Sequence, residues 1–196
     1  MGPIGALVLA GGQGRRFGRD KRVAEMPSGQ TLLEATLGKI IPAFEETLVV
    51  LRPGDDALAG ILAQKFTTLT ITIAKNAALG MGHSLAHGAT MIHHWQGAAI
   101  CLGDMPFHES STLSTLRHGF RTASQPYPII KPCHNGRAGH PVLFHRHYFA
   151  AMQALTGDEG ARTLLKAHAA AVQEIDVGDL GVLQDVDEPS DLSELF

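Results

Sequence analysis

The chain contains 196 residues, of which 44% are hydrophobic and 18% charged, and it carries a formal net charge of −3. This balance is ordinary for a folded globular protein and indicates no disorder. The basic residues cluster at 15–22 instead of forming an extended stripe, which argues against a nucleic-acid or anionic-membrane surface and favours a small anion as ligand.

The length suits one domain over residues 1–196, which would bury about 70% of its unfolded surface. Two cysteines provide no disulfide framework, and Cys101 lies in an apolar run where a buried side chain is expected. The apolar N-terminal segment is broken by glycines and lacks the basic region of a signal peptide. No apolar run approaches the ~18 residues of a membrane span. We therefore expect a cytoplasmic protein that has neither membrane nor nucleic acid as a partner.

Short apolar runs alternate with amphipathic stretches, a pattern typical of βαβ units around a mostly parallel sheet. Residues 4–9 predict a buried strand, and Thr31 and Glu34 have the capping-box spacing of a helix that Pro42 ends. This order predicts a three-layer α/β fold with its ligand at the carboxyl ends of the strands. Further strands are expected at 47–51, 69–74, 98–102, 127–130, 141–144 and 172–177, and further helices at 55–65, 84–93, 109–121, 147–155 and 159–171.

The segment directly after the first strand is rich in glycine and in positive charge. Its glycines let backbone N–H groups approach a phosphate chain closely. Four cationic side chains fall within seven residues, which a merely flexible glycine loop does not explain. We expect Arg16 and Lys21 to contact a polyphosphate. Arg15 and Arg19 fit solvent exposure equally well, and Arg22 fits it better.

Two other phosphate-binding motifs do not fit this segment. A Walker A loop requires lysine directly after its last glycine, but Gly18 is followed by arginine. A dinucleotide fingerprint requires a third glycine for close helix packing, but Phe17 occupies that position. An NAD(P)-dependent oxidoreductase remains an alternative, in which Glu34 would hold a ribose, although Glu34 fits the capping box better.

Read as L-A-G-G-x-x-x-R-F-G-x-x-K, residues 9–21 resemble the nucleotidyltransferases that complete the molybdenum cofactor, and more distantly the sugar-phosphate nucleotidyltransferases. The resemblance spans most of the chain. It implies a Rossmann-like nucleotide-diphospho-sugar transferase fold of the glycosyltransferase-A type, with a mostly parallel sheet. Further matching segments lie at 80–85, 102–106, 136–141, 157–162 and 185–191.

Asp104 follows the strand expected at 98–102, so its carboxylate should project at the carboxyl edge of the sheet, where a metal ligand would be well placed. Mg²⁺ prefers one or two carboxylates together with phosphate oxygens and water. Asp187 could supply the second carboxylate, with Asp185 as the alternative. The resemblance assigns Asp104 and Asp187 to Mg²⁺, with Mn²⁺ as a substitute, whereas each aspartate could instead cap a helix or turn.

The resemblance implies a reaction in which a phosphate on an acceptor attacks the α-phosphorus of a nucleoside triphosphate and pyrophosphate leaves. Catalysis would come from positioning and charge neutralisation, with Arg16, Lys21 and Asp104 as catalytic residues. No nucleophilic side chain is needed. The predicted nucleotide-binding residues are Leu9, Ala10, Gly11, Gly12, Gly14, Arg16, Lys21, Gly80, Met81, Ser84 and Gly103.

The acceptor that the resemblance implies is molybdopterin cofactor, with Arg137, His140 and Arg162 as the residues that would touch it. A hairpin turn and a helix start explain the neighbouring glycines without any ligand, and Ser84 could likewise be a helix cap. Another phosphorylated acceptor, such as a sugar 1-phosphate or phospholactate, is an alternative. A non-catalytic nucleotide or cofactor carrier is a further one.

The signals for the nucleobase conflict. Gly11 resembles the guanylyltransferases of this group, whereas the Gly-His-Pro segment at 139–141 and the segment at 157–162 resemble the cytidylyltransferases. CTP is therefore favoured slightly over GTP. Glu188 and Ser190 depart from the threonine and glutamate of the family's closing motif. A product handed on would imply transient contact with a molybdoenzyme or its chaperone.

Overall fold

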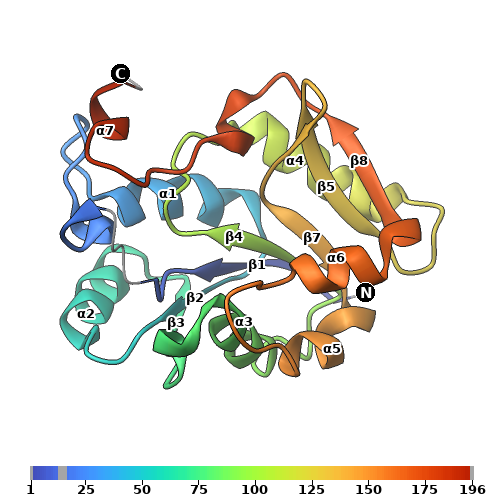
Figure 1. Cartoon of the computed structure of the whole chain (residues 1–196), viewed down its shortest axis with the longest axis horizontal. Coiled ribbons are helices and arrows are strands. Elements are labelled where there is room, and N and C mark those ends of the chain that lie inside the picture. The colour runs from blue at the N-terminus through green and yellow to red at the C-terminus, as the bar shows by residue number, and fades with distance from the viewer. Residues whose placement is uncertain (1, 13–16, 195–196) are drawn as a thin grey trace.

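The computed structural model describes residues 2–12 and 17–194, which form a mixed sheet with helices on both faces (Figure 1). Strand order across the sheet is β3-β2-β1-β4-β7-β5-β6, and β8 pairs with β5. The strands are β1 (Ile4–Leu9), β2 (Thr47–Leu51), β3 (Leu69–Ile73), β4 (Gly97–Leu102), β5 (Ile129–His134), β6 (Arg137–Ala138), β7 (Val142–His145) and β8 (Val172–Asp176).

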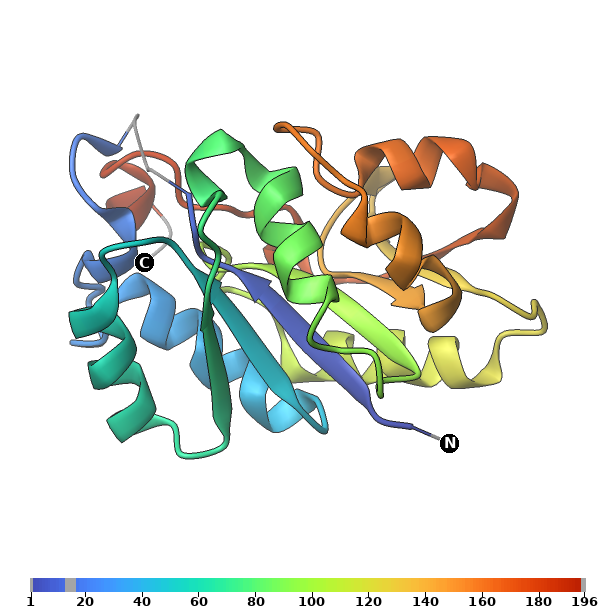
Figure 2. The ribbon, with the colours of Figure 1, turned by 90° about the horizontal axis from the view of Figure 1, so that it is seen from below.

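The centre of the sheet is parallel, as the sequence predicts. Strand β1 runs parallel to both β2 and β4, and Leu9 lies opposite Val50 on one side and Leu102 on the other. Only β7 and β6 run against their neighbours among the described strands. The carboxyl ends of β1, β2 and β4 therefore share one edge of the sheet. There the segment after β1 and the C-terminal segment come together (Figures 1 and 2).

The helices form two layers around the sheet (Figure 2). One layer packs on the face that carries Val8, and the other packs on the face that carries Leu7. The predicted three-layer α/β fold is confirmed. The first layer holds α1 (Leu32–Ile40), α2 (Asp56–Lys65) and α4 (Ser110–Thr122), and the second holds α3 (Met81–Ala89), α5 (Phe149–Gln153) and α6 (Arg162–Ala167).

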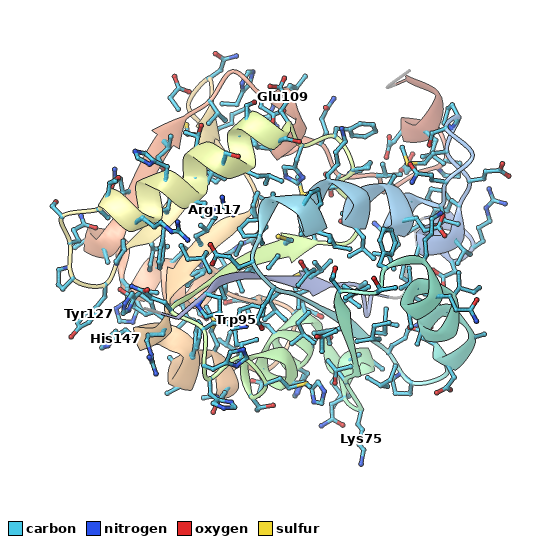
Figure 3. The ribbon with its side chains drawn as sticks, turned by 180° about the vertical axis from the view of Figure 1, so that it is seen from behind. Lys75, Trp95, Glu109, Arg117, Tyr127 and His147 are labelled. Carbon is cyan, nitrogen blue, oxygen red and sulfur yellow. The ribbon has the colours of Figure 1, made fainter. Side chains whose placement is uncertain are left out.

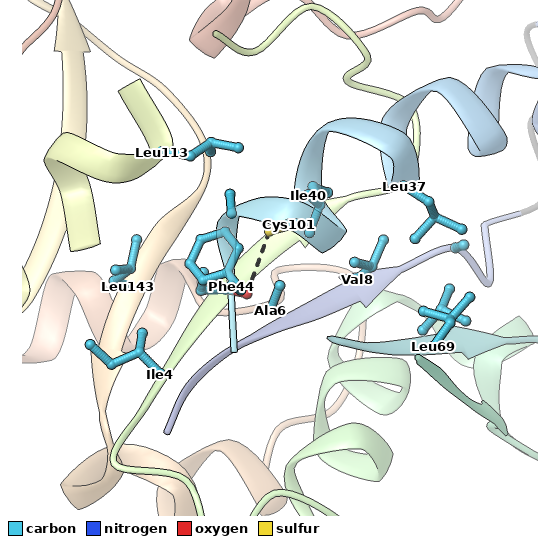
Figure 4. Packing of buried hydrophobic residues seen from close by; sticks show 14 of the residues in the cluster. Ile4, Ala6, Val8, Leu37, Ile40, Phe44, Leu69, Cys101, Leu113 and Leu143 are labelled. Atoms are coloured by element: carbon cyan, nitrogen blue, oxygen red, sulfur yellow. Dashed lines mark hydrogen bonds between the residues drawn. The ribbon is translucent and has the colours of Figure 1, made fainter. Parts of the chain in front are cut away.

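Strand β1 is buried on both faces, which explains its unbroken apolar run. Ile4, Ala6 and Val8 point to the first helix layer, where they pack near Leu37 and Ile40 of α1 (Figure 4). Because alternate residues face opposite sides of a sheet, the residues between them contact the second layer. The site edge is thus the end of a rigid, fully covered strand.

Partly buried polar contacts hold elements together on the far side of the molecule, where Trp95 and Arg117 lie (Figure 3). Trp95 packs beneath Gly5, where an added Cβ would lie 2.5 Å from the indole ring, and its Nε1 donates to Glu46 Oε2 at 2.8 Å. Arg117 of α4 donates to the carbonyl of Ala43 at 2.6 Å. Among the described residues, none of the helices has the length and apolar character that a membrane crossing would need.

Several element boundaries differ from the sequence prediction. The capping box of α1 is present, but α3 starts at Met81 instead of residue 84 because Gly80, at φ 125°, ends the preceding turn. The helix expected at 159–171 is broken into α6 and a short 3-10 turn by His168, which leaves helical geometry at φ −120°. The helix expected at 147–155 is likewise reduced to α5 after a 3-10 turn.

Candidate active site

A cavity of about 480 Å³ opens at the carboxyl ends of β1 and β4. Asp158, which the sequence analysis did not single out, also lines it, as does Arg22. Gly14 and Arg16 lie outside the described residues. The predicted residues that line the cavity are Leu9, Ala10, Gly11, Gly12, Lys21, Gly80, Met81, Ser84, Gly103 and Asp104.

Lys21 lies at the floor of this cavity between two carboxylates. Its Nζ is 2.7 Å from Asp104 Oδ2 and 2.8 Å from Asp187 Oδ1. It also donates to the carbonyl oxygen of Val186 at 2.9 Å. Burial lowers the pKa of Lys21, but the two carboxylates more than offset that effect, and the net pKa is raised. The side chain is therefore held as an ammonium.

Asp104 is positioned by the tight packing of β4 against β1. The N–H of Gly103 donates to the Leu9 carbonyl at 3.0 Å, and a Cβ at Gly103 would lie 3.0 Å from the side chain of Ala10. The alternative that Asp104 caps the following helix is wrong, because Glu109 occupies the N-cap of α4.

The C-terminal segment brings Asp187 to the same place. Val186 is fully buried in a small apolar cluster with Phe17 and Leu32, and its N–H donates to the Asp104 carbonyl at 3.0 Å. The anchored Val186 fixes Asp187 opposite Lys21. A short helix, α7 (Asp191–Glu194), follows, and the Asp191 side chain accepts from the N–H of Asp187 at 2.8 Å.

Asp185, the alternative metal ligand, lines a different cavity. Its pKa is raised, first by burial and then by the negative charges of Asp187 and Asp104, while Lys21 opposes the shift. Three carboxylates thus influence one another around a single ammonium. Asp104 Oδ1 is buried and has no hydrogen-bond partner within the part of the chain that the structure describes.

The expectation that Arg22 is solvated is wrong. Arg22 is 4% exposed, and its guanidinium donates to the carbonyl of Ala10 at 2.8 Å and to both oxygens of Asp55. It also bonds Asp20, whose pKa is lowered chiefly by that hydrogen bond. Arg22 therefore ties the end of the glycine segment to the start of α2.

Arg52 is a functional candidate that the sequence analysis missed. Its Nη1 donates to the carbonyl of Gly12 at 2.7 Å, and its Nη2 donates to Asp20 Oδ2 at 2.7 Å. Arg52 directly follows β2, which is parallel to β1, so its place at the shared carboxyl edge was an available signal. The residue supports the backbone of the glycine segment from outside the cavity.

A second cavity of about 500 Å³ adjoins the first. All three predicted acceptor residues, Arg137, His140 and Arg162, line it, together with Lys131. The two cavities share Leu9, Met81, Leu102 and Asp158 as lining residues. The sequence segments that contain these residues are far apart in the chain, yet the fold brings them to two adjoining cavities.

The segment that carries His140 is tied to the segment that carries Asp104. His108 is buried, with Nδ1 2.9 Å from the Met105 carbonyl and Nε2 3.0 Å from the His140 carbonyl. Burial lowers the pKa of His108 and of His140. The lowered pKa favours the neutral ring of His140, which lines the second cavity, and its buried Nδ1 has no hydrogen-bond partner among the described residues.

Glycines join α3 to the turn before α6. A Cβ at Gly80 would lie 2.4 Å from the Gly157 carbonyl oxygen, and a Cβ at Gly82 would lie 2.5 Å from that of Thr156. The N–H of Gly82 donates to Gly157 at 2.8 Å. Ser84 does not cap the helix, because it lies buried inside α3. These contacts fix the start of α3 against the turn at 156–158, and so position Met81 and Asp158, which line both cavities.

The donor set at Asp104 and Asp187 fits a divalent cation. Mg²⁺ and Mn²⁺ accept carboxylate oxygens, and one oxygen of Asp104 is buried without a partner. Within residues 2–12 and 17–194 no group of three or more His, Cys, Asp or Glu side chains is arranged to hold a metal. A cation here would rest on this carboxylate pair and on ligand oxygens.

Comparisons with known proteins show the family to which the chain belongs. A family model described as "MobA-like NTP transferase domain" matches residues 6–172. Nicotine blue oxidoreductase of Paenarthrobacter nicotinovorans is 28% identical over 190 residues, covering 94% of this chain and 92% of that protein. A probable molybdenum cofactor guanylyltransferase of Mycolicibacterium paratuberculosis is 30% identical over 120 residues, covering 59% of this chain and 56% of that protein.

Among solved structures, Rv0371c from Mycobacterium tuberculosis H37Rv is 26% identical, with a TM-score of 0.82, covering 99% of this chain and 97% of that one. A complex of Rv0371c with manganese is 25% identical, with a TM-score of 0.78, covering 98% of this chain and 97% of that one. Structural similarity thus extends across nearly the whole chain.

Proposed function

Because the chain belongs to the family of MobA-like NTP transferases, we propose that it transfers a nucleoside monophosphate from CTP or GTP to molybdopterin cofactor, releasing pyrophosphate. The whole chain, residues 1–196, would act as one domain. The observation that carries the proposal is the pair of adjoining cavities, with Lys21 and Asp104 lining the first, Asp187 paired with Lys21, and basic side chains lining the second.

The nucleoside triphosphate would lie in the first cavity. Backbone N–H groups of the glycine segment suit phosphate oxygens, and Arg16 and Lys21 would stabilise the leaving pyrophosphate. Gly11 packs closely against Ala77 and Ser84, because an added Cβ would lie 3.1 Å from both side chains. The glycine therefore brings the backbone after β1 close to the turn and helix that form the opposite side of the cavity.

Asp104 and Asp187 would hold Mg²⁺ or Mn²⁺, as the manganese complex of the relative Rv0371c supports. When bound, the cation supplies neutralisation of charge on phosphate oxygens. The chain's own contribution is to hold the two carboxylates on a stiff support, through the strand end at Gly103 and the buried anchor at Val186.

In the reaction, an oxygen of the acceptor phosphate forms a bond to the α-phosphorus, while the bond from the α-phosphorus to its bridging oxygen breaks. The electron pair leaves with pyrophosphate. No proton transfer by a side chain is required, because the attacking phosphate oxygen is already anionic. Met81 and Asp158 line both cavities, so the protein would align the two substrates on either side of these residues.

The acceptor would occupy the second cavity. Arg137 and Arg162 suit a phosphate, because guanidinium groups bind phosphate oxygens in a bidentate manner. A neutral His140 suits the hydrogen-bonding edge of a pterin. The name of the mycobacterial relative, a molybdenum cofactor guanylyltransferase, supports this acceptor over a sugar 1-phosphate or phospholactate.

An oxidoreductase is the second candidate, because one relative carries that name. In this chain, however, the carboxylate that would hold a ribose is already engaged. Glu34 is 8% exposed, accepts from the N–H of Thr31 at 2.9 Å and pairs with Lys65 at 2.9 Å. The structure therefore favours nucleotidyl transfer.

Pyrophosphate release tests the proposal. Each of CTP, GTP, ATP and UTP would be supplied with Mg²⁺ and molybdopterin, using wild type, Asp104→Asn and the exposed control Asp56→Asn on α2. We expect release with CTP or GTP in wild type and control, and its loss in Asp104→Asn. Release that requires a different phosphorylated acceptor would overturn the molybdopterin assignment and leave the transfer chemistry in place.

A further inference from the structure

Lys21 occupies the position between carboxylates that a divalent cation would take. We propose that Lys21 is a resident cation that competes with the divalent metal for Asp104 and Asp187, so that metal binding must displace its ammonium group toward the phosphate side of the cavity. This inference rests on the proposed assignment of those two aspartates to the metal.

The hydrogen bonds of Lys21 carry the argument. An ammonium group has three N–H donors and no acceptor. All three are matched by nearby oxygens: Asp104 Oδ2 at 2.7 Å, Asp187 Oδ1 at 2.8 Å and the Val186 carbonyl at 2.9 Å. In this position Lys21 has no donor left for a phosphate oxygen. Its contact with the carboxylates and its predicted contact with a polyphosphate therefore exclude each other.

The charges at the site favour replacement of the Lys21 ammonium by a divalent cation. One ammonium lies 2.7 Å from Asp104 Oδ2 and 2.8 Å from Asp187 Oδ1, so a single positive charge faces two carboxylates. The ammonium leaves Asp104 Oδ1 buried without a partner. A divalent cation brings twice the charge and can accept that oxygen as a ligand, so it satisfies the site more fully than Lys21 does.

The side chain of Lys21 has room to move, whereas its neighbour does not. Lys21 begins a 3-10 turn whose backbone is fixed by the N–H of Ala24, which donates to the Lys21 carbonyl at 3.1 Å. Its flexible four-carbon stem lines the first cavity. Arg22, in contrast, is held by Asp20 and Asp55 away from the carboxylate pair. Lys21 can therefore leave the carboxylate pair, whereas Arg22 stays fixed in its ion pairs.

The test is Mn²⁺ binding without nucleotide, measured by electron paramagnetic resonance of the free ion. Lys21→Met should bind Mn²⁺ at least about tenfold more tightly than wild type, since one neighbouring charge shifts the proton affinity of a carboxylate by about one to three powers of ten and a divalent cation carries twice the charge of a proton. Lys65→Met, which removes the same charge from the distant pair with Glu34, should bind like wild type. Asp104→Asn should abolish tight binding.

A second measurement needs no variant. Acylation of lysines in wild type, mapped by mass spectrometry, should label Lys21 faster when saturating Mn²⁺ is added, whereas Lys65 should not change. Unchanged Lys21 labelling overturns the exchange proposal even if Lys21→Met does not fold. So does loss of Mn²⁺ binding in Asp104→Asn combined with no gain in Lys21→Met. Mn²⁺ binding unaffected by Asp104→Asn would instead overturn the metal assignment itself.

Discussion

Replacing Arg22 by methionine should destabilise the protein strongly, although the residue contacts no substrate in the proposed mechanism. Methionine keeps the apolar stem but removes a guanidinium whose side chain is 5% exposed and which bonds both oxygens of Asp55. Asp55 is itself 9% exposed, and its remaining partners are the backbone N–H of Arg52 at 3.0 Å and Arg52 Nε at 3.6 Å. The substitution therefore leaves a buried carboxylate largely uncompensated.

Breaking a buried ion pair by removing one partner costs about 3–5 kcal/mol, and the residual contacts from Arg52 place this case near about 3 kcal/mol. For a chain of this size, that loss lowers the melting temperature by roughly 6–12 °C. Urea unfolding followed by fluorescence of the single tryptophan, the buried Trp95, measures the change. Arg146→Met, at an exposed arginine, is the matched control and should change stability by less than about 0.5 kcal/mol.

A double variant tests the electrostatic reason. Adding Asp55→Asn to Arg22→Met removes the uncompensated charge and should restore part of the lost stability, whereas Asp55→Asn alone should be destabilising because it weakens the pair. A loss below about 1 kcal/mol in Arg22→Met, or no recovery in the double variant, would refute the reasoning.

Three further predictions concern the second cavity, the glycine contacts of α3 and the buried histidine. Arg137→Met should raise KM for the acceptor about tenfold to a hundredfold with KM for the nucleotide unchanged, because a charge-assisted bond contributes ~1.5–3 kcal/mol; equal effects on both constants would contradict the separate cavities. Gly82→Ala should cost about 1–3 kcal/mol in urea unfolding because its methyl group meets the 156–158 turn, whereas Gly60→Ala, in open space on α2, should gain about 0.5–1 kcal/mol. The pKa of His108 is lowered by burial, so below its ordinary value of 6.5 the unfolded state takes up a proton that the folded state resists. Stability should therefore decline as the pH falls from 7 to 5, less so in His108→Gln, and an equal decline in both proteins would contradict this origin.

The fold and much of the site were predictable because they follow from local patterns. The apolar run of β1 places the glycine segment after it at a sheet edge, and the strand before Asp104 places a carboxylate in the same cavity. The predicted acceptor residues also line one cavity. In each case the spacing within a few residues determines which edge or turn carries the side chain.

The errors arise where distant segments decide the outcome. The sequence favoured a solvent-exposed Arg22 because its partner Asp55 lies 33 residues away in the chain. The bond between Lys21 and Asp187 spans 166 residues, and nothing in either segment alone indicates it. The start of α3 depends on the packing of Gly80 against Gly157, which only the tertiary structure shows.

In the proposed reaction, a nucleoside monophosphate moves from the triphosphate in the first cavity to the acceptor in the second. The most direct test of this transfer is to supply CTP or GTP labelled at the α-phosphate, together with Mg²⁺ and molybdopterin, and to follow the label by chromatography. The account predicts that wild type moves the label into a dinucleotide product and that Asp104→Asn does not. A label that stays with the nucleotide while both substrates bind wild type, or that is transferred equally well by Asp104→Asn, would contradict it.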